Sequence, residues 1–272
     1  MSALKQMLTY LVLLMGALVS LFPFVILIFT ALKLDRQTFS GQAWSPPNPA
    51  TLDNVRVAIV DNHFVGYMLT TALVALAMSA GQLVFSSFAG YAFARLRFPG
   101  RDVLFWAYLA TLMVPNIVTL IPLFIITQKL GLSDTFLGLV LPYALGSPFG
   151  VFLMRQYFLT LPEDLEAAAS LDGAGTFRTF VSIILPLSKS IMATLGLMTL
   201  VAGWNNYLWP LIESSSDATR VITVEIASMS SNYGTQIGVM MATAVLATAP
   251  LAVLYLIFQK QLVQSISITG LK

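Results

Sequence analysis

The sequence predicts an all-α integral membrane protein with six transmembrane helices and a cytoplasmic helix–turn–helix between the fourth and fifth. Two observations predict this class. The 272-residue chain is 57% hydrophobic and only 10% charged, with a mean hydropathy of +0.83, whereas soluble domains are roughly 45–50% apolar and about 25% charged. Long apolar segments also recur along the chain, and one ordered polar segment, residues 161–189, stands between two of them. We therefore expect residues 1–272 to form a single membrane domain.

Six apolar segments are long enough, or nearly so, to cross a bilayer. A helix needs about 20 apolar residues to cross a hydrocarbon core of roughly 30 Å with its backbone groups paired internally. The first segment is too long for a signal-peptide core and is expected to be retained. The fourth is short and interrupted by two prolines and a glycine. The segments are Leu8–Leu32, Tyr67–Ala94, Val103–Thr127, Leu137–Met154, Ile191–Ile212 and Ile237–Phe258.

Charge in the connectors predicts the orientation of these segments. Nine of the 14 Lys and Arg residues fall on one side of the six segments and five on the other. Positive charge gathers in cytoplasmic connectors. We therefore expect both termini and residues 161–189 in the cytoplasm, and connectors 33–66 and 213–236 outside.

Several classes of chemistry are excluded by what the sequence lacks. It has no cysteine and one histidine, His63, which excludes disulfides, thiolate chemistry and His/Cys metal sites. No catalytic site is expected, because His63 has no nucleophile–base arrangement around it. A net charge of +2 without runs of like charge indicates no nucleic-acid partner. The chain also lacks a G-x-x-x-x-G-K-[ST] phosphate loop, so no cofactor is expected in it.

The six segments contain no Asp, Glu, Lys, Arg or His. Proton-coupled carriers, pumps and voltage sensors use such buried ionisable groups. Energy for uphill transport is therefore expected to enter from another subunit. A self-contained channel or secondary carrier remains the alternative, because sodium sites can be built from backbone and hydroxyl oxygens.

The polar segment "LPEDLEAAASLDGAGTFRTFVSIILPLSK" predicts two short helices. The first is expected to begin at Thr160 or Leu161, with Pro162 in its first turn and acids at the positive end of its dipole. Gly173 is expected to end it. The apolar spacing predicts a second helix over Thr176–Ile184, which Pro186 stops.

Such an element is suited to dock in a groove of a partner protein. The alternative is a loop that rests on the membrane surface. Membrane-surface helices are typically rich in Lys and Arg, however, whereas this element begins with acids that anionic lipids repel.

Two motifs carry a resemblance to a known family. "EAAASLDGA" (residues 166–174), followed by "ILPL" (residues 184–187), resembles the EAA loop of the permease subunits of binding-protein-dependent ABC importers. "GWNNYLWPL" (residues 203–211) and the tail 236–272 are similar to the carbohydrate-uptake branch of that family. Within this branch the sequence most resembles the glycerol-3-phosphate and glycerophosphodiester permeases, followed by the maltose-type permeases.

The resemblance implies a subunit of a transporter in the bacterial inner membrane that is not itself an enzyme. It implies a second homologous permease, two cytoplasmic ABC ATPase subunits that bind ATP and Mg, and an extracytoplasmic solute-binding protein as partners, besides membrane lipid. Ser190 and the ending "SISITGLK" depart from the usual pattern of the family. The residues expected to couple to the ATPase are Glu166, Ala167, Ala168, Asp172, Gly173, Ala174, Leu185 and Pro186.

Candidate contacts with the solute are neutral side chains near the ends of the apolar segments. Amides hydrogen-bond hydroxyl groups, although an amide in a membrane span can equally bridge two helices. The aromatic residues Trp204, Tyr207 and Trp209 are expected to form an interfacial belt, with stacking on a sugar as the alternative. The connector around Tyr233 and Gly234 is expected to reach toward the binding protein. The candidates for the solute pathway are Asn205, Asn206, Asn116, Trp204 and Tyr207.

Overall fold

The structure is a computed structural model that describes residues 3–40, 44–61, 63–232 and 236–269. Throughout this part of the chain, the regular structure is helical, as the composition predicts. The residues group into two compact units, 1–68 with 222–253 and 69–221 with 254–272. A single membrane domain over residues 1–272 stays a prediction.

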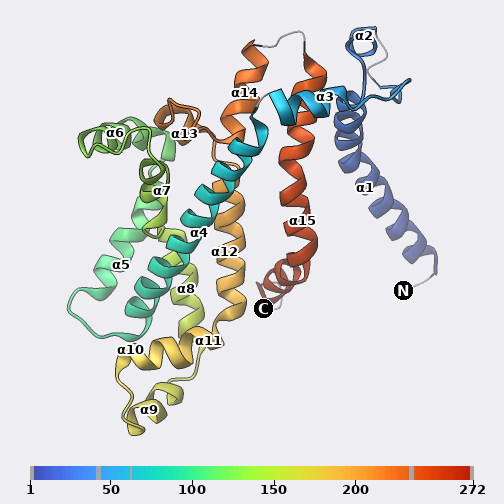
Figure 1. Cartoon of the computed structure of the whole chain (residues 1–272). Helices are drawn as coiled ribbons and strands as arrows, with labels where there is room; N and C mark the ends of the chain where they lie inside the picture. Colours follow the sequence, from blue (N-terminus) through green and yellow to red (C-terminus); the bar gives the residue numbers. More distant parts are fainter. Residues whose placement is uncertain (1–2, 41–43, 62, 233–235, 270–272) are drawn as a thin grey trace. The chain divides into compact units, whose positions relative to one another are not determined.

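Three helices are each long and apolar enough to cross a membrane. They lie in α1 (Ala3–Ala31), α4 (Phe64–Arg95) and α15 (Ile237–Thr269). Three further pairs of helices meet this criterion together but are bent at a short break, so the described residues offer six spans when each bent pair counts as one. Figure 1 shows the course of these helices along the chain.

The first unit joins the N-terminal helix to parts of the C-terminal region. One of its apolar clusters contains Ala31, Ala58, Val239 and Ala242, and a second contains Phe64, Tyr67, Ile222 and Ala247. The unit contains α1, the start of α4, part of α15, α2 (Asp35–Thr38), α3 (Asp53–Arg56), the π-helical turn η1 (Val57–Asp61) and α14 (Ile222–Asn232).

The Asn54 side chain joins three segments of this unit. Its Nδ2 donates to the backbone oxygens of Ala31 at 3.0 Å and Lys33 at 2.7 Å, which satisfies carbonyls at the end of α1. Gly238 at the start of α15 packs on the same amide, because a Cβ there would lie 2.5 Å from Asn54 Nδ2. Described residues of α1, of connector 33–66 and of α15 therefore pack around one buried side chain.

The second unit contains residues 161–188, called the coupling loop below after its expected role, and a cavity that several of the predicted pathway residues line. Its apolar residues form two clusters, one around Met78, Leu139 and Trp209 and the other around Tyr91, Phe158 and Phe180. After α4 it contains α5 (Arg101–Ala110), the 3-10 turn η2 (Thr111–Met113), α6 (Asn116–Lys129), α7 (Phe136–Ala144), α8 (Pro148–Thr160), α9 (Asp164–Leu171), α10 (Thr176–Thr179), the π-helical turn η3 (Phe180–Ile184), α11 (Leu185–Leu187), α12 (Lys189–Trp204) and α13 (Leu208–Glu213).

The third predicted segment, Val103–Thr127, is not a continuous helix. The helical residues Arg101–Met113 and α6 meet at an angle of 103°. Val114 has extended backbone angles and Pro115 is the N-cap of α6. The residue before a proline avoids the α conformation, so the helix ends there.

The fourth and fifth predicted segments also have different bounds. In the fourth, α7 and α8 meet at 43° around Gly146, whose φ is +93°, and α8 continues to Thr160 instead of Met154. The fifth was expected to run to Ile212, but α12 ends at Trp204. Pro210 explains this break, because a proline clashes with the carbonyl four residues earlier in a continuous helix.

Connector 213–236, for which no helix was expected, contains α14. Ile222, Ile226 and Met229 lie on one face of it at three- and four-residue spacing, and Ile222 and Met229 are buried. The helix is too short for this pattern to stand out in an apolar sequence. Tyr233 and Gly234, which were expected to reach toward a binding protein, lie outside the described residues.

Candidate functional site

The loop between α8 and α12 contains a helix that begins three to four residues later than predicted. Because α8 extends to Thr160, Pro162 lies in the connection and α9 begins at Asp164. Asp164 and Glu166 occupy its first turn, where negative charge interacts favourably with the helix dipole.

The end of α9 is formed as the sequence predicts. Gly173 has a φ of +76°, a conformation that glycine adopts without steric cost. Its N–H donates to Ser170 O at 3.1 Å, and the N–H of Ala174 donates to Ala169 O at 2.9 Å. These two bonds form a Schellman motif, which pairs the last carbonyls of the helix.

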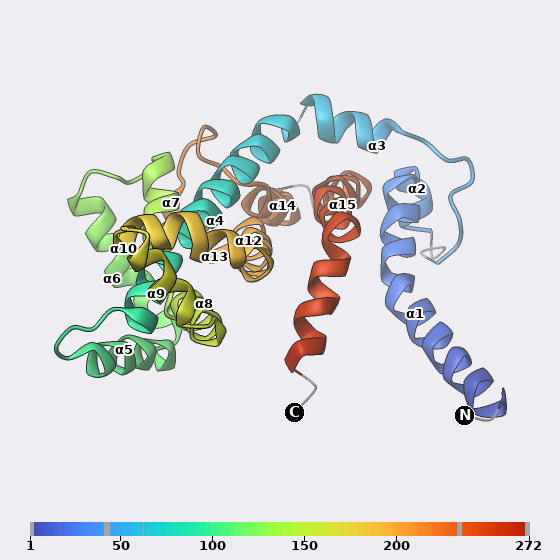
Figure 2. The ribbon, with the colours of Figure 1, turned by 90° about the horizontal axis from the view of Figure 1, so that it is seen from below.

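The second helical segment runs further than expected. It continues from α10 through η3 and α11 to Leu187, so Pro186 does not stop it at Ile184. Pro186 has no N–H to donate, and the π-helical turn directly before it accommodates the altered hydrogen bonding. The bend of 79° occurs at Ser188, the residue before α12. Figure 2 shows this segment crossing the end of the unit toward α12.

Aromatic rings hold the coupling loop on the last turns of α4. Phe180 lies 4.7 Å from Tyr91 and 5.2 Å from Phe88, measured between ring centroids. Tyr91 also packs edge-on against Phe158 of α8. By contrast, Leu171 at the tip of α9 is 91% exposed, so this apolar side chain is free to meet a partner.

The predicted coupling residues fall into two groups by exposure. Glu166, Ala174 and Leu185 are half-buried against the rest of the unit. The remainder face outward, and these are Ala167, Ala168, Asp172, Gly173 and Pro186. Their contact with an ATPase stays a prediction.

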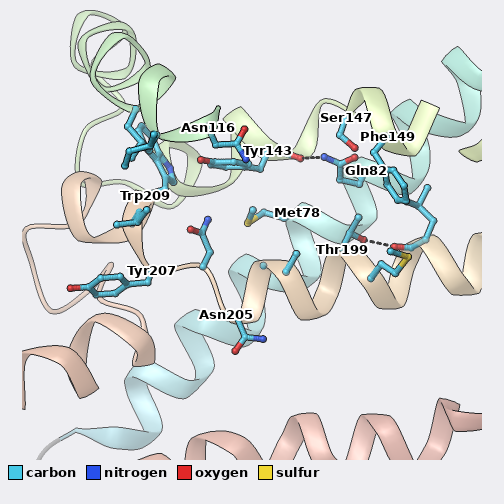
Figure 3. A pocket seen from close by; sticks show the side chains of 18 residues that line it. Met78, Gln82, Asn116, Tyr143, Ser147, Phe149, Thr199, Asn205, Tyr207 and Trp209 are labelled. Atoms are coloured by element: carbon cyan, nitrogen blue, oxygen red, sulfur yellow. Dashed lines mark hydrogen bonds between the residues drawn. The ribbon is translucent and has the colours of Figure 1, made fainter. Parts of the chain in front are cut away.

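A cavity of about 600 Å³ lies between α4, α6, α7 and α12, and Figure 3 shows its lining side chains. Four predicted pathway residues line it, namely Asn116, Asn205, Asn206 and Tyr207. Trp204 is not among the lining residues, and its side chain is buried.

The sequence interpretation missed several polar residues that line this cavity. Gln82 donates from Nε2 to the backbone oxygen of Tyr143 and accepts from Ser86 Oγ at 3.4 Å. It is the one amide in the second apolar segment, and an isolated polar group in a membrane span is a usable signal. Ser147 and Thr199 also line the cavity.

Trp204, Tyr207 and Trp209 were expected to form an interfacial aromatic belt, and this prediction is wrong for Trp204 and Trp209. Trp204 and Trp209 are only 6% and 1% exposed, so they pack inside the unit and do not face lipid headgroups. Trp209 is held by a hydrogen bond from Nε1 to Gly138 O and by an edge-on contact with Tyr143.

Two acids lie at the end of the unit opposite the coupling loop. Glu213 is fully buried and its Oε2 accepts from Thr127 Oγ1 at 3.0 Å. Burial raises the pKa of Glu213 above its ordinary value, although the bond from Thr127 acts in the opposite direction. Hydrogen bonds from the Thr219 hydroxyl and the Ser215 N–H hold the pKa of Asp134 well below its usual range.

The cavity and its surroundings suit the recognition of neutral polar groups. In the part of the chain that the structure describes, no charged side chain lines the cavity. The same residues contain no group of three or more His, Cys, Asp or Glu that could hold a metal ion. The amide and hydroxyl side chains of the lining are therefore best matched to hydroxyl groups on a ligand, because both kinds of group donate and accept hydrogen bonds.

Comparison with known proteins identifies the family. Residues 82–268 match the family described as "Binding-protein-dependent transport system inner membrane component". The chain belongs to this family. It is an inner-membrane permease subunit of an importer, and the resemblance carried by residues 166–174 and 184–187 is confirmed.

Relatives of this permease cover almost its whole length. It is 35% identical to the sn-glycerol-3-phosphate transport system permease protein UgpE of Yersinia pestis over 265 residues, 94% of each chain. It is 31% identical to a putative ABC transporter permease protein of a Caldicellulosiruptor species, over 92% of this chain and 91% of that protein. A chain in the crystal structure of a bacterial ABC transporter involved in the import of the acidic polysaccharide alginate has the same fold, with a TM-score of 0.84 at 22% identity over 94% of this chain and 96% of that one.

Proposed function

We propose that this permease forms half of the translocation pathway of an ATP-driven importer for a polyhydroxylated solute. The observation that carries the proposal is the cavity, whose polar lining consists of amides and hydroxyls. Its volume of about 600 Å³ lies within the roughly 300–1,000 Å³ typical of small-molecule sites. Similarity to the sn-glycerol-3-phosphate permeases favours glycerol-3-phosphate or a glycerophosphodiester, with di- or oligosaccharides as the next class.

In this proposal, different subunits bind different parts of the solute. A phosphate group is bound best by cationic or forked donors, and the described residues place none in the cavity wall. Asn116, Asn205 and Gln82 can instead exchange hydrogen bonds with hydroxyl groups. We assign the hydroxyl-bearing part of the solute to this subunit, and any phosphate to the binding protein or the second permease.

The coupling loop is the proposed point where ATP hydrolysis acts on this chain. In the proposal, two cytoplasmic ATPase subunits bind ATP and Mg, and the outward-facing residues of α9 contact one of them. Closure of the ATPase dimer moves the loop, and the two permeases switch between inward-open and outward-open states as packed bodies. Both termini are cytoplasmic in this scheme, and an extracytoplasmic binding protein delivers the solute.

ATP hydrolysis by the assembled complex in lipid, with its binding protein present, tests the substrate class. The panel consists of sn-glycerol-3-phosphate, a glycerophosphodiester and maltose, with inorganic phosphate and an amino acid as controls. We expect at least one polyhydroxylated solute to stimulate hydrolysis, while both controls leave it at the basal rate. Stimulation by the amino acid alone, or by none of the solutes, would contradict the proposal.

A further inference from the structure

Arg95, the last residue of α4, is buried although the sequence places it in a cytoplasmic connector. Its side chain is 5% exposed. Nη2 donates to the backbone oxygen of Phe158 at 2.8 Å and also to that of Leu161. These carbonyls lie at the end of α8, where helix oxygens lack partners and carry partial negative charge. Part of the guanidinium therefore binds α8.

The rest of the guanidinium faces the coupling helix α9. Arg95 Nε lies 3.6 Å from Glu166 Oε1, and Nη1 lies 3.6 Å from Glu163 Oε1. Glu163 is 90% exposed, so water screens its contribution. Glu166 is only 25% exposed, and the Tyr91 hydroxyl lies beside its carboxylate. Glu166 is thus the carboxylate through which α4 holds α9.

The contact between Arg95 and Glu166 is close but incomplete. Arg95 Nε and Glu166 Oε1 are both buried, and neither makes a hydrogen bond within the described residues. The bonds of Arg95 to α8, by contrast, are made. In a poorly solvated site the energy of an ion pair depends strongly on its separation. A small displacement of α9 therefore changes the contact between Arg95 and Glu166, while the hydrogen bonds of Arg95 to the end of α8 persist.

The helix that ends in Arg95 also forms a wall of the cavity. Met78 and Gln82 line the cavity from the middle of α4, and α4 contains no proline. Arg95 lies 13 positions after Gln82 in the sequence, which corresponds to about 20 Å of continuous helix. A displacement applied at Arg95 thus reaches the cavity through one rigid element.

We infer that Arg95 is a positioning residue that transmits movement of α9 to the cavity wall, by binding the end of α8 and Glu166 at once. The inference rests on the proposed function of the permease as an ATP-coupled subunit. If Arg95 served only to cap α8, its two carbonyl bonds would suffice, and the separation from Glu166 would have no consequence for transport.

The test is the number of solute molecules taken up per ATP hydrolysed by the full complex in proteoliposomes. Arg95→Gln removes the charge, and we expect this ratio to fall about tenfold, a factor within the range typical of coupling between two sites. Arg95→Lys keeps the charge but loses the forked geometry, so we expect an intermediate ratio. Arg97→Gln is the matched control, because Arg97 is exposed and no ion pair to it occurs in the described residues.

A purely structural role would lower the amount of complex without changing uptake per ATP. A wild-type ratio in Arg95→Gln would therefore overturn the inference. If the complex with Arg95→Gln does not assemble, Arg95→Lys replaces it in the test. A wild-type ratio of uptake to ATP hydrolysis in Arg95→Lys would then overturn the inference.

A second measurement tests, independently of transport, whether Arg95 holds α9 in place. The chain has no cysteine, so Leu171→Cys with Val103→Cys places two spin labels on exposed positions of the full chain in lipid nanodiscs. We expect Arg95→Gln to broaden the distribution of distances between them, and Arg97→Gln to leave it unchanged. An unbroadened distribution overturns the inference even if the complex transports nothing. Absence of ATP-driven uptake by the wild type, by contrast, counts against the proposed function alone.

Discussion

Trp209 Nε1 donates a hydrogen bond to the backbone oxygen of Gly138 at 3.1 Å. This bond joins α13 to α7 directly beside the cavity. The same glycine also contacts Glu213, because a Cβ on Gly138 would overlap both Glu213 Oε1 and the backbone oxygen of Leu132. Close approach of α13 to α7 therefore requires glycine at position 138.

Gly138→Ala should destabilise the protein by about 1–3 kcal/mol, since the added methyl meets a backbone carbonyl that cannot rotate away. The measurement is thermal unfolding of the purified chain in detergent. Gly66→Ala is the control, because a Cβ at Gly66 meets nothing within 4 Å and alanine favours a helix. Equal unfolding temperatures of the two variants would show that α7 and α13 do not pack closely.

Gly173→Ala should weaken retention of the ATPase. A φ of +76° costs a non-glycine residue about 1–2 kcal/mol, so the cap that follows α9 should rearrange. Co-purification of the ATPase with the permease measures this effect. Gly175→Ala is the matched control in the same loop, because Gly175 has a φ of −73° and open space around it. A complex that retains its ATPase equally with either variant would exclude a role for the Gly173 turn.

Asn116→Ala should raise the solute KM about fivefold, as expected for one lost hydrogen bond of about 1 kcal/mol. Asn116 lines the cavity with an exposed side chain. The amide of Asn205 instead donates to Val201 O at 2.9 Å in its own helix, so Asn205→Ala should raise KM less. Solute-stimulated ATP hydrolysis at varied solute concentration gives both values. The reverse order would assign the contact to Asn205.

Glu213→Gln should be more stable than the wild type at high pH, and this advantage should shrink as the pH falls. Because burial raises the pKa of Glu213, ionisation opposes folding once the pH exceeds the ordinary value for a carboxyl group. A glutamine carries no such penalty and can still accept from Thr127. The unfolding temperatures of the two proteins should differ most near about pH 8 and converge near about pH 4. A difference independent of pH would contradict this account.

Patterns that depend on local backbone chemistry could be predicted from the sequence. Gly173 is an example, because the helix-ending conformation favours glycine regardless of its surroundings. The break in the fourth segment followed in the same way from its prolines and Gly146. Pro115 and Pro210 carried the same kind of signal, but the apolar runs around them were interpreted as continuous spans.

Features that depend on tertiary contacts could not be predicted. Glu213 is buried against Thr127, which lies 86 residues away in the sequence. Arg95 is buried against Phe158, which lies 63 residues away. No periodicity in the sequence indicates either contact. Trp209 was expected at a lipid interface because tryptophan is common there. Only its position beside Gly138 shows that it is buried within the unit.

The central claim is that ATP hydrolysis drives a polyhydroxylated solute through a pathway that includes this permease. The most direct measurement is accumulation of radiolabelled sn-glycerol-3-phosphate, or of whichever panel solute stimulates hydrolysis, by proteoliposomes that contain the full complex and the binding protein. The account predicts accumulation above the external concentration with ATP and none with a non-hydrolysable analogue. Equal flux without ATP, or flux through this chain alone, would contradict it and indicate a self-contained channel or carrier.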